Sequence, residues 1–363
     1  MSLGSDSAIQ NLKPVLSNVE GSKIQNRKGW SRRKFIGTAA FAGTGALLGL
    51  RSDSRAAEPP LETNKLKIGV DSTSSCGTAP KLIAEDSLRG EGFTDLQYVR
   101  GKGGRADEEL LAAGKIDLMT GFVGRHIIRV DGGDPTVILA GLHAGCYELF
   151  GTDQVLSIRD LKGKRVAVTQ LTSGRHILFA LMAAQVGLDP RKDINWVTEP
   201  AAKSIQLFAE RKVDAFMTFP LEPQELRAKK IGHVVVNMMM DRPWSQYFCC
   251  MVAGNRDFVR KNPVATKRAL RALLKASDVC VREPERAARL LVDKGFAKNY
   301  DYVLEAMKEI GYSKWREFDP EDTMRFYSLR LHEVGMIKNT PQKIIAQGTD
   351  WRFLRELKKE LKA

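Results

Sequence analysis

Hydroxyl-bearing and small side chains gather in two loops that follow predicted strands, one in each half of the chain. A strand at 66–71 precedes one loop and a strand at 165–169 precedes the other, and a helix follows each loop. A helix N-terminus offers unpaired N–H groups and a partial positive charge, which suit an anion. We therefore predict ligand contacts from Thr73, Ser74, Ser75, Cys76, Thr169, Thr172, Ser173 and Gly174. The alternative is that Thr172 or Ser173 only caps its helix.

Two further loops of the first half fall at the same predicted edge. Thr120, Gly121 and Phe122 follow a strand at 116–119, and His143 follows a strand at 137–142. In sheets covered by helices, ligands lie beyond the carboxyl ends of the strands. These four residues complete the expected contacts of the first half.

An arginine-histidine pair recurs after a glycine in both halves. Arg125-His126 follows Gly124 and Arg175-His176 follows Gly174, each at the start of a predicted helix. Neighbouring helical residues diverge by about 100°, so only one of each pair is expected to face the ligand. Arg175 or Arg125 would bind an anion bidentately. Phe219 and Glu222 in the second half are the remaining predicted contacts.

Motifs for catalysis or metal binding are absent from the sequence. It contains no HExxH, GxSxG or Walker A pattern, and its five cysteines lack zinc or redox spacing. Adjacent Cys249 and Cys250 on a predicted strand are expected to point to opposite faces. We therefore interpret the cysteines as buried small side chains and predict a protein without catalytic residues, cofactor or metal.

The elements that carry these residues alternate between strand and helix. After the strand at 66–71, helices at 79–88, 105–113 and 123–130 alternate with strands at 96–99, 116–119 and 137–142. A second alternation runs from 165 to 237. Such alternation predicts an α/β fold with two doubly wound αβ lobes, each built on a sheet covered by helices.

From Pro263 onward the pattern is helical, which predicts a C-terminal helical return. Basic residues at helical spacing, Lys267, Arg268, Arg271 and Lys275, are expected to form a solvated face. Extended segments at 146–151 and 246–253 are expected to form a two-segment hinge. The predicted domains are a leader at 1–56, lobe I at 57–150 and 247–363, and lobe II at 151–246.

The leader resembles an export signal. Arg32-Arg33 precedes an apolar run at 35–50, and small residues follow at 54–56, the order of a twin-arginine signal peptide. We expect export to the periplasm, with the mature chain starting near Ala57. Lysine and arginine exceed acids by 57 to 43, but no long basic run follows the leader, so no nucleic-acid partner is expected.

Several segments, in order, carry a family resemblance. They are DLKGKRVAV at 160–168, Ser173-Gly174, VGLDP at 186–190, KVDA at 212–215 and Glu222-Pro223. Over about 65–300 the chain resembles the periplasmic solute-binding proteins of nitrate, sulfonate and taurine ABC importers, which have the type II periplasmic-binding fold. One departure is Phe219-Pro220-Leu221, where the class commonly has a tryptophan before the Glu-Pro pair.

The resemblance implies a monomeric binding protein that captures a small organic, anionic solute such as a sulfonate or carboxylate. Its lobes would close on the solute and present it to an inner-membrane ABC permease and ATPase. The alternatives are a pyrimidine-synthase-like enzyme on the same fold, using Cys249 and Cys250, and a binding protein for a thiamine-pyrimidine precursor.

Overall fold

The computed structural model describes residues 58–70, 75–101 and 106–362. The predicted leader at 1–56 lies outside these residues, and so do Thr73 and Ser74. Within the described part, no helix combines the length and the apolar character needed to cross a membrane. Residues 58–363 form one compact unit.

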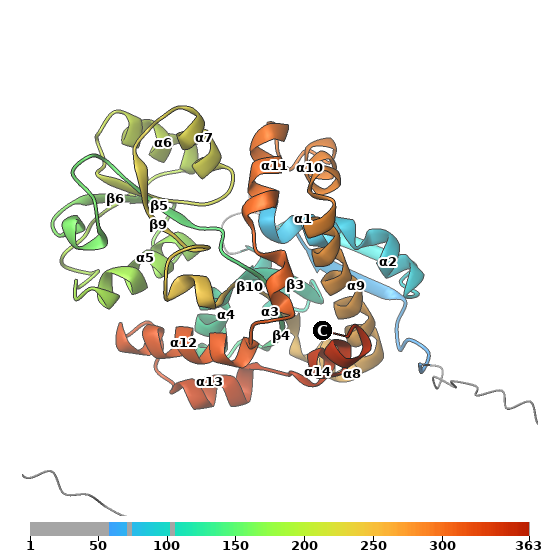
Figure 1. The fold of residues 1–363 in the computed structure, drawn as a ribbon. Helices are drawn as coiled ribbons and strands as arrows, with labels where there is room; N and C mark the ends of the chain where they lie inside the picture. The colour runs from blue at the N-terminus through green and yellow to red at the C-terminus, as the bar shows by residue number, and fades with distance from the viewer. Residues whose placement is uncertain (1–57, 71–74, 102–105, 363) are drawn as a thin grey trace, which may run out of the picture. The chain divides into compact units, whose positions relative to one another are not determined.

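Two five-stranded mixed sheets organise this unit (Figure 1). The first has the order β2-β1-β3-β10-β4, from β1 (Lys65–Gly69), β2 (Asp95–Val99), β3 (Leu118–Phe122), β4 (Thr136–Ala144) and β10 (Phe248–Asn255). The second has the order β7-β6-β8-β5-β9, from β5 (Glu148–Gly151), β6 (Arg165–Val168), β7 (Asn195–Thr198), β8 (Ala215–Thr218) and β9 (His233–Asn237). The predicted α/β fold of two helix-covered sheets is confirmed.

Helices alternate with the strands along both sheets. Those of the first alternation are α1 (Ser75–Ile83), α2 (Glu85–Gly90), α3 (Ala106–Ala112) and α4 (Val123–Asp131). Those of the second are α5 (Gly174–Gln185), α6 (Ala201–Ala209) and α7 (Glu222–Ala228), with 3-10 turns η1 (Ile158–Leu161) and η2 (Trp244–Gln246). Ser173 caps α5 through its hydroxyl, which accepts from the His176 N–H.

The C-terminal return is helical, as predicted. It contains α8 (Arg256–Lys261), α9 (Pro263–Arg282), α10 (Pro284–Asp293), α11 (Tyr300–Glu309), η3 (Tyr312–Trp315), α12 (Pro320–Glu333), α13 (Pro341–Gly348) and α14 (Arg352–Glu360). Proline occupies the first turn of α9, α10, α12 and α13, where its missing N–H costs no helical hydrogen bond. The sequence pattern did not identify α8 and α13.

Strands β4 and β10 are buried along their whole lengths and lie side by side in the first sheet. β10 runs antiparallel to both β3 and β4. Because of this pairing, β3 and β4 continue beyond the ends that the sequence predicted. Thr120, Gly121 and Phe122 are therefore strand residues paired with β10, and His143 is a strand residue of β4. The prediction that these four residues lie in loops was wrong, because their pairing partner comes more than a hundred residues later.

Two segments connect the sheets. The first consists of residues 145–147 between β4 and β5, and the second of residues 238–247 between β9 and β10. We call them the first and second crossovers. Most of the extended segments expected at 146–151 and 246–253 is ordered strand, since β5 pairs within the second sheet and β10 within the first.

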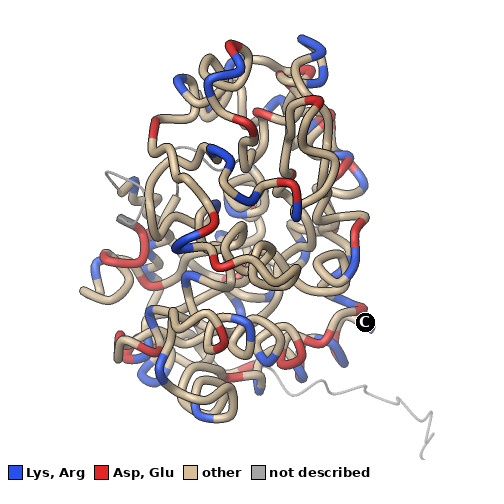
Figure 2. The backbone as a smooth tube through the Cα atoms, turned by 90° about the vertical axis from the view of Figure 1, so that its left-hand side faces the viewer, with Lys and Arg blue, Asp and Glu red and all other residues tan. Residues whose placement is uncertain are grey.

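The basic stripe of α9 is not the solvated face that its spacing predicted. Arg271 leaves only 10% of its side chain exposed and pairs with Glu58, Glu91 and Glu360. Lys275 alone of the stripe is exposed. The acids come from the N-terminal segment, α2 and α14, so helix periodicity could not reveal them. Figure 2 shows acidic and basic residues interspersed along the chain.

Candidate functional site

The ends of strands from both sheets meet around Tyr147 in the first crossover. Its ring lies 5.6 Å from that of Phe122 in β3 and 4.9 Å from that of Phe219, which follows β8. At Gly174 a Cβ atom would lie 2.5 Å from the Tyr147 hydroxyl, so the start of α5 approaches the crossover too closely for a larger residue. Three predicted contacts, Phe122, Gly174 and Phe219, thus lie together.

Arg175 and Glu222, both predicted to contact the ligand, bind each other. Arg175 Nη2 donates to Glu222 Oε1 at 2.7 Å, and Nη1 donates to the other carboxylate oxygen and to the Met217 carbonyl at 3.0 Å. The Phe219 N–H donates to the same carboxylate at 2.9 Å. Burial alone would lower the pKa of Arg175, but Glu222 raises it above its ordinary value. The guanidinium charge is therefore neutralised by Glu222.

The loop before α5 is organised by hydrogen bonds within itself. Thr172 is exposed, has a φ of 69°, and donates its N–H to His176 Nδ1 at 3.2 Å. Ser173 is buried and caps α5, as the alternative interpretation holds. Thr169 is half-buried after β6.

In the first half, Thr120 Oγ1 donates to the Gly77 carbonyl at 3.1 Å and ties β3 to the start of α1.

A cavity of about 290 Å³ lies between α4 and α5. We call it the α4–α5 cavity; it is lined by Glu108, Arg125, Ile128, Arg129, Thr172, His176, Ile177 and Met336. Arg125 pairs with Glu108, and Arg129 pairs with Asp134. Of the two Arg-His pairs, Arg125 and His176 line this cavity, whereas His126 is fully buried and Arg175 binds Glu222. One member of each pair faces the cavity, as helix geometry predicts.

A second cavity, of about 250 Å³, lies beside the first crossover. We call it the Cys146 cavity; its lining includes Cys146, Glu148, Met239, Met240 and Glu309. Both carboxylates bind Arg227. Burial, the leading influence, keeps the pKa of Glu148 above its usual range even though Arg227 lowers it.

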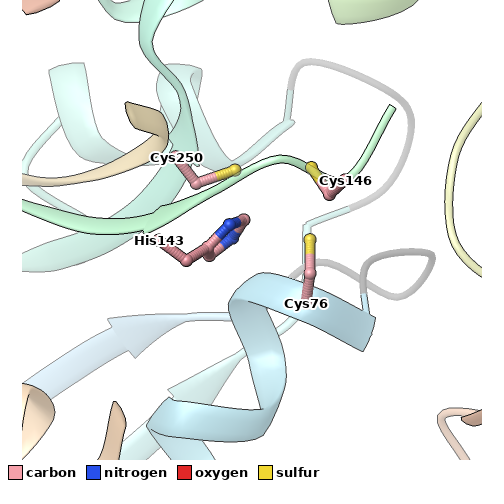
Figure 3. A group of neighbouring side chains, drawn as sticks. All are labelled: Cys76, His143, Cys146 and Cys250. Carbon is pink, nitrogen blue, oxygen red and sulfur yellow. The ribbon is translucent and has the colours of Figure 1, made fainter. Parts of the chain in front are cut away.

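Four chemistry-bearing side chains meet at Cys146, one of the residues that line this cavity (Figure 3). They come from α1 (Cys76), β4 (His143), the first crossover (Cys146) and β10 (Cys250), and we call them the Cys/His cluster. Their Sγ atoms and one imidazole nitrogen all lie within 4.8 Å of one another, and all four residues are buried. Figure 3 shows the side chains pointing toward a common centre. Three thiols and an imidazole are a ligand set typical of zinc.

A fourth sulfur adjoins this cluster. Cys249 Sγ lies 2.9 Å from Cys146 Sγ and 3.9 Å from Cys250 Sγ. The expectation that Cys249 and Cys250 point to opposite faces was wrong, because the pairing of β10 with β4 shifts register on both sides of Cys250. Such a bulge breaks the strict alternation of side chains along a strand.

The cluster is electrostatically coupled. Burial would lower the pKa of His143, but the nearby Cys250 and Cys76 sulfurs raise it to about 10. A hydrogen bond from Cys146 lowers the pKa of Cys250, whereas burial raises that of Cys146. These directions favour a protonated His143 imidazole beside a cysteine thiolate. The proton then occupies the position on the imidazole that a metal cation would otherwise take.

Sequence reasoning named Cys76 and His143 as site residues and Cys250 only in the enzyme alternative, and it missed Tyr147 and Cys146. The cysteines lie in four separate segments, so no spacing rule connects them. A local signal existed for Cys146, which follows His143 by three residues in a short connection between strands. Of the other predicted contacts, Thr73 and Ser74 lie outside the described residues, and the side chain of Ser75 is likewise not described.

Comparisons with known proteins place these features in context. A family model described as the NMT1-like family matches residues 61–292. The bicarbonate-binding protein CmpA of Synechococcus elongatus is 30% identical over 112 residues, which cover 30% of this chain and 24% of that protein. The chain thus matches about a quarter of the length of this curated relative.

Solved structures share the fold at low sequence identity. The periplasmic nitrate-binding protein NrtA from Synechocystis PCC 6803 aligns with a TM-score of 0.70 and 16% identity, covering 84% of this chain and 90% of that one. The alkanesulfonate-binding protein SsuA from Xanthomonas axonopodis, bound to MOPS, aligns with a TM-score of 0.60 and 17% identity, covering 77% and 96%. Both likenesses concern the fold.

Proposed function

Because the chain belongs to the NMT1-like family, we propose that it is the extracytoplasmic solute-binding component of an ABC importer. The observation that carries the proposal is that strand ends and helix starts of both sheets meet at one junction, around Tyr147 and the α4–α5 cavity. The names of the relatives, binding proteins for bicarbonate, nitrate and alkanesulfonate, support binding as the activity. The twin-arginine leader supports export to the periplasm.

The solute that we propose is a small organic anion, bound in the α4–α5 cavity. Two arginines line this cavity, Arg125 paired with Glu108 and Arg129 paired with Asp134, and an anionic solute would compete with these carboxylates for the guanidinium donors. Ile128, Ile177 and Met336 supply apolar surface for a carbon skeleton. Burial lowers the pKa of His176, which therefore serves as a neutral hydrogen-bonding group at pH 7. A volume of about 290 Å³ fits a small molecule.

The proposed mechanism is closure of two lobes about the two crossovers. The lobes are those expected from the sequence, at 57–150 with 247–363 and at 151–246, except that β5 (Glu148–Gly151) pairs within the second sheet and so belongs to the second lobe. Helices α4 and α5 belong to different lobes. A solute that contacts both helices therefore favours the closed arrangement of the lobes over the open one. A monomer in this state would be the form that the membrane permease and its ATPase recognise.

The test is a thermal-shift screen of the mature chain against sulfonates, carboxylates, neutral pyrimidines and organic cations. A ligand that binds only the folded state, present at 100 times its Kd, stabilises that state by about 2.7 kcal/mol. Scattering at saturation should then show a smaller radius of gyration.

Arg125 and Glu108 provide a sign test, since either substitution breaks the same ion pair. For an anionic solute, Arg125→Gln should weaken binding by about tenfold or more, whereas Glu108→Gln should leave it unchanged or tighten it. The reverse order would mean a cationic solute. Equal affinities in both variants would place the site elsewhere.

A further inference from the structure

We propose that Cys76, His143, Cys146 and Cys250 form a tetrahedral binding site for Zn²⁺. The four ligand atoms already lie within 4.8 Å of one another, although they come from four separate segments. Around Zn²⁺, with Zn–S near 2.3 Å and Zn–N near 2.0–2.1 Å, ligand atoms are about 3.6–3.8 Å apart. The largest separation that the cluster allows thus exceeds the tetrahedral spacing by about 1 Å.

The orientation of His143 supports this assignment. Its Nδ1 lies 3.3 Å from the Ala144 carbonyl, and its Nε2 is buried without a hydrogen-bonding partner among the described residues. Metal-binding histidines are commonly held in this way, with one ring nitrogen on a backbone carbonyl and the other directed to the ion. The Cys250 and Cys76 sulfurs that act on this imidazole are themselves proposed ligands, so Zn²⁺ would bind where these groups already interact.

The surroundings suit a thiophilic cation. Cys76 lies in the first turn of α1 and brings a soft sulfur ligand to the cluster. The Cys146 cavity meets the cluster at Cys146, and Met239 and Met240 in its lining add thioether groups beside it. Binding would release the thiol protons and the imidazole proton to water, leaving thiolates and a neutral imidazole on the metal.

Four protein ligands leave no open position for a substrate, so the role of the ion is structural. Three ligands belong to elements of the first sheet layer, and the fourth, Cys146, belongs to the first crossover. The ion would therefore fix residues 145–147 against α1, β4 and β10. The ion would thus fix one end of the proposed hinge. This role does not depend on which solute the α4–α5 cavity binds.

The first experiment uses the full chain, reduced and stripped with a chelator, then given excess Co²⁺ and desalted. We expect one Co²⁺ per chain, with the thiolate-to-cobalt charge-transfer band and the visible bands of tetrahedral cobalt. Zn²⁺ should displace it and raise the melting temperature. X-ray absorption of the Zn²⁺ form should give three sulfur ligands and one nitrogen ligand.

Matched variants locate the site. Cys250→Ser and Cys76→Ser should weaken Zn²⁺ binding by at least about 100-fold, since losing a direct ligand costs more than the 10–100-fold of an outer partner. Cys280→Ser, a buried cysteine of α9 outside the cluster, should retain stoichiometric metal. Cys249→Ser, next to Cys250 on the same strand, should also retain it.

Three results would overturn the proposal. One is a reduced wild-type chain that retains no Co²⁺ or Zn²⁺. This result counts equally for a chain that is isolated with a Cys146–Cys249 disulfide and still takes up no metal after that disulfide is reduced. Another is a coordination shell of oxygen and nitrogen alone. The last is loss of metal by Cys280→Ser equal to that by Cys250→Ser. If the Cys76→Ser chain does not fold, the X-ray absorption spectrum of the wild-type chain still tests whether three sulfurs and one nitrogen bind the ion. None of these measurements depends on the transported solute.

Discussion

Replacing Arg175 with Met should destabilise the fold by about 3–5 kcal/mol. Only 11% of the Arg175 side chain and 14% of that of Glu222 are exposed. The substitution removes two charge-assisted hydrogen bonds to Glu222 and one to the Met217 carbonyl. Among the described residues, Glu222 then keeps only the Phe219 N–H as a donor, and an uncompensated buried carboxylate is costly.

The double variant Arg175→Met/Glu222→Leu separates charge from packing. It leaves no buried charge, and the Phe219 N–H loses its acceptor, so it should cost only about 1 kcal/mol. Urea unfolding followed by circular dichroism measures all the variants, and Glu222→Gln should resemble the single arginine variant. A cost below about 1 kcal/mol for Arg175→Met would refute the reasoning, because it would mean that solvent or another acid satisfies Glu222.

Three further perturbations test the packing and electrostatics. Burial, followed by the nearby Arg125, lowers the pKa of His126 from 6.5 to about 4. The unfolded chain therefore binds more protons between these values, and stability should fall by about 2 kcal/mol from pH 7 to pH 5, a slope that His126→Leu should flatten in urea titrations. Gly174→Ala should cost about 1–3 kcal/mol because its Cβ meets the Tyr147 hydroxyl, and less in a Tyr147→Phe background, as thermal unfolding would reveal. Arg271→Met should cost about 1–3 kcal/mol, mainly by removing the Arg271 partner of Glu91, because Glu58 keeps Lys267 and Arg268 and Glu360 keeps Lys267, whereas exposed Lys275→Ala should stay within about 0.5 kcal/mol; equal effects would contradict the buried network.

Local patterns in the sequence predicted most of the elements. The predicted strand at 96–99 and the predicted helix at 123–130 match β2 and α4 to within one residue, because apolar periodicity is a property of neighbouring residues. The short helices α8 and α13 escaped because six to eight residues carry too little periodicity. The extensions of β3 and β4 were not predicted because antiparallel β10 supplies their hydrogen bonds from a distant part of the chain.

By itself the sequence determined the family, the alternation that builds two helix-covered sheets, and the strand ends where polar groups collect. These follow from short-range order along the chain. The tertiary structure alone decided which of those groups meet. Arg175 finds Glu222 rather than remaining an unpaired cation, and Cys76, His143, Cys146 and Cys250 converge from four segments. The reason is physical: a buried charge or thiol acquires its partner from the elements packed against it, and that packing involves residues that no local spacing connects.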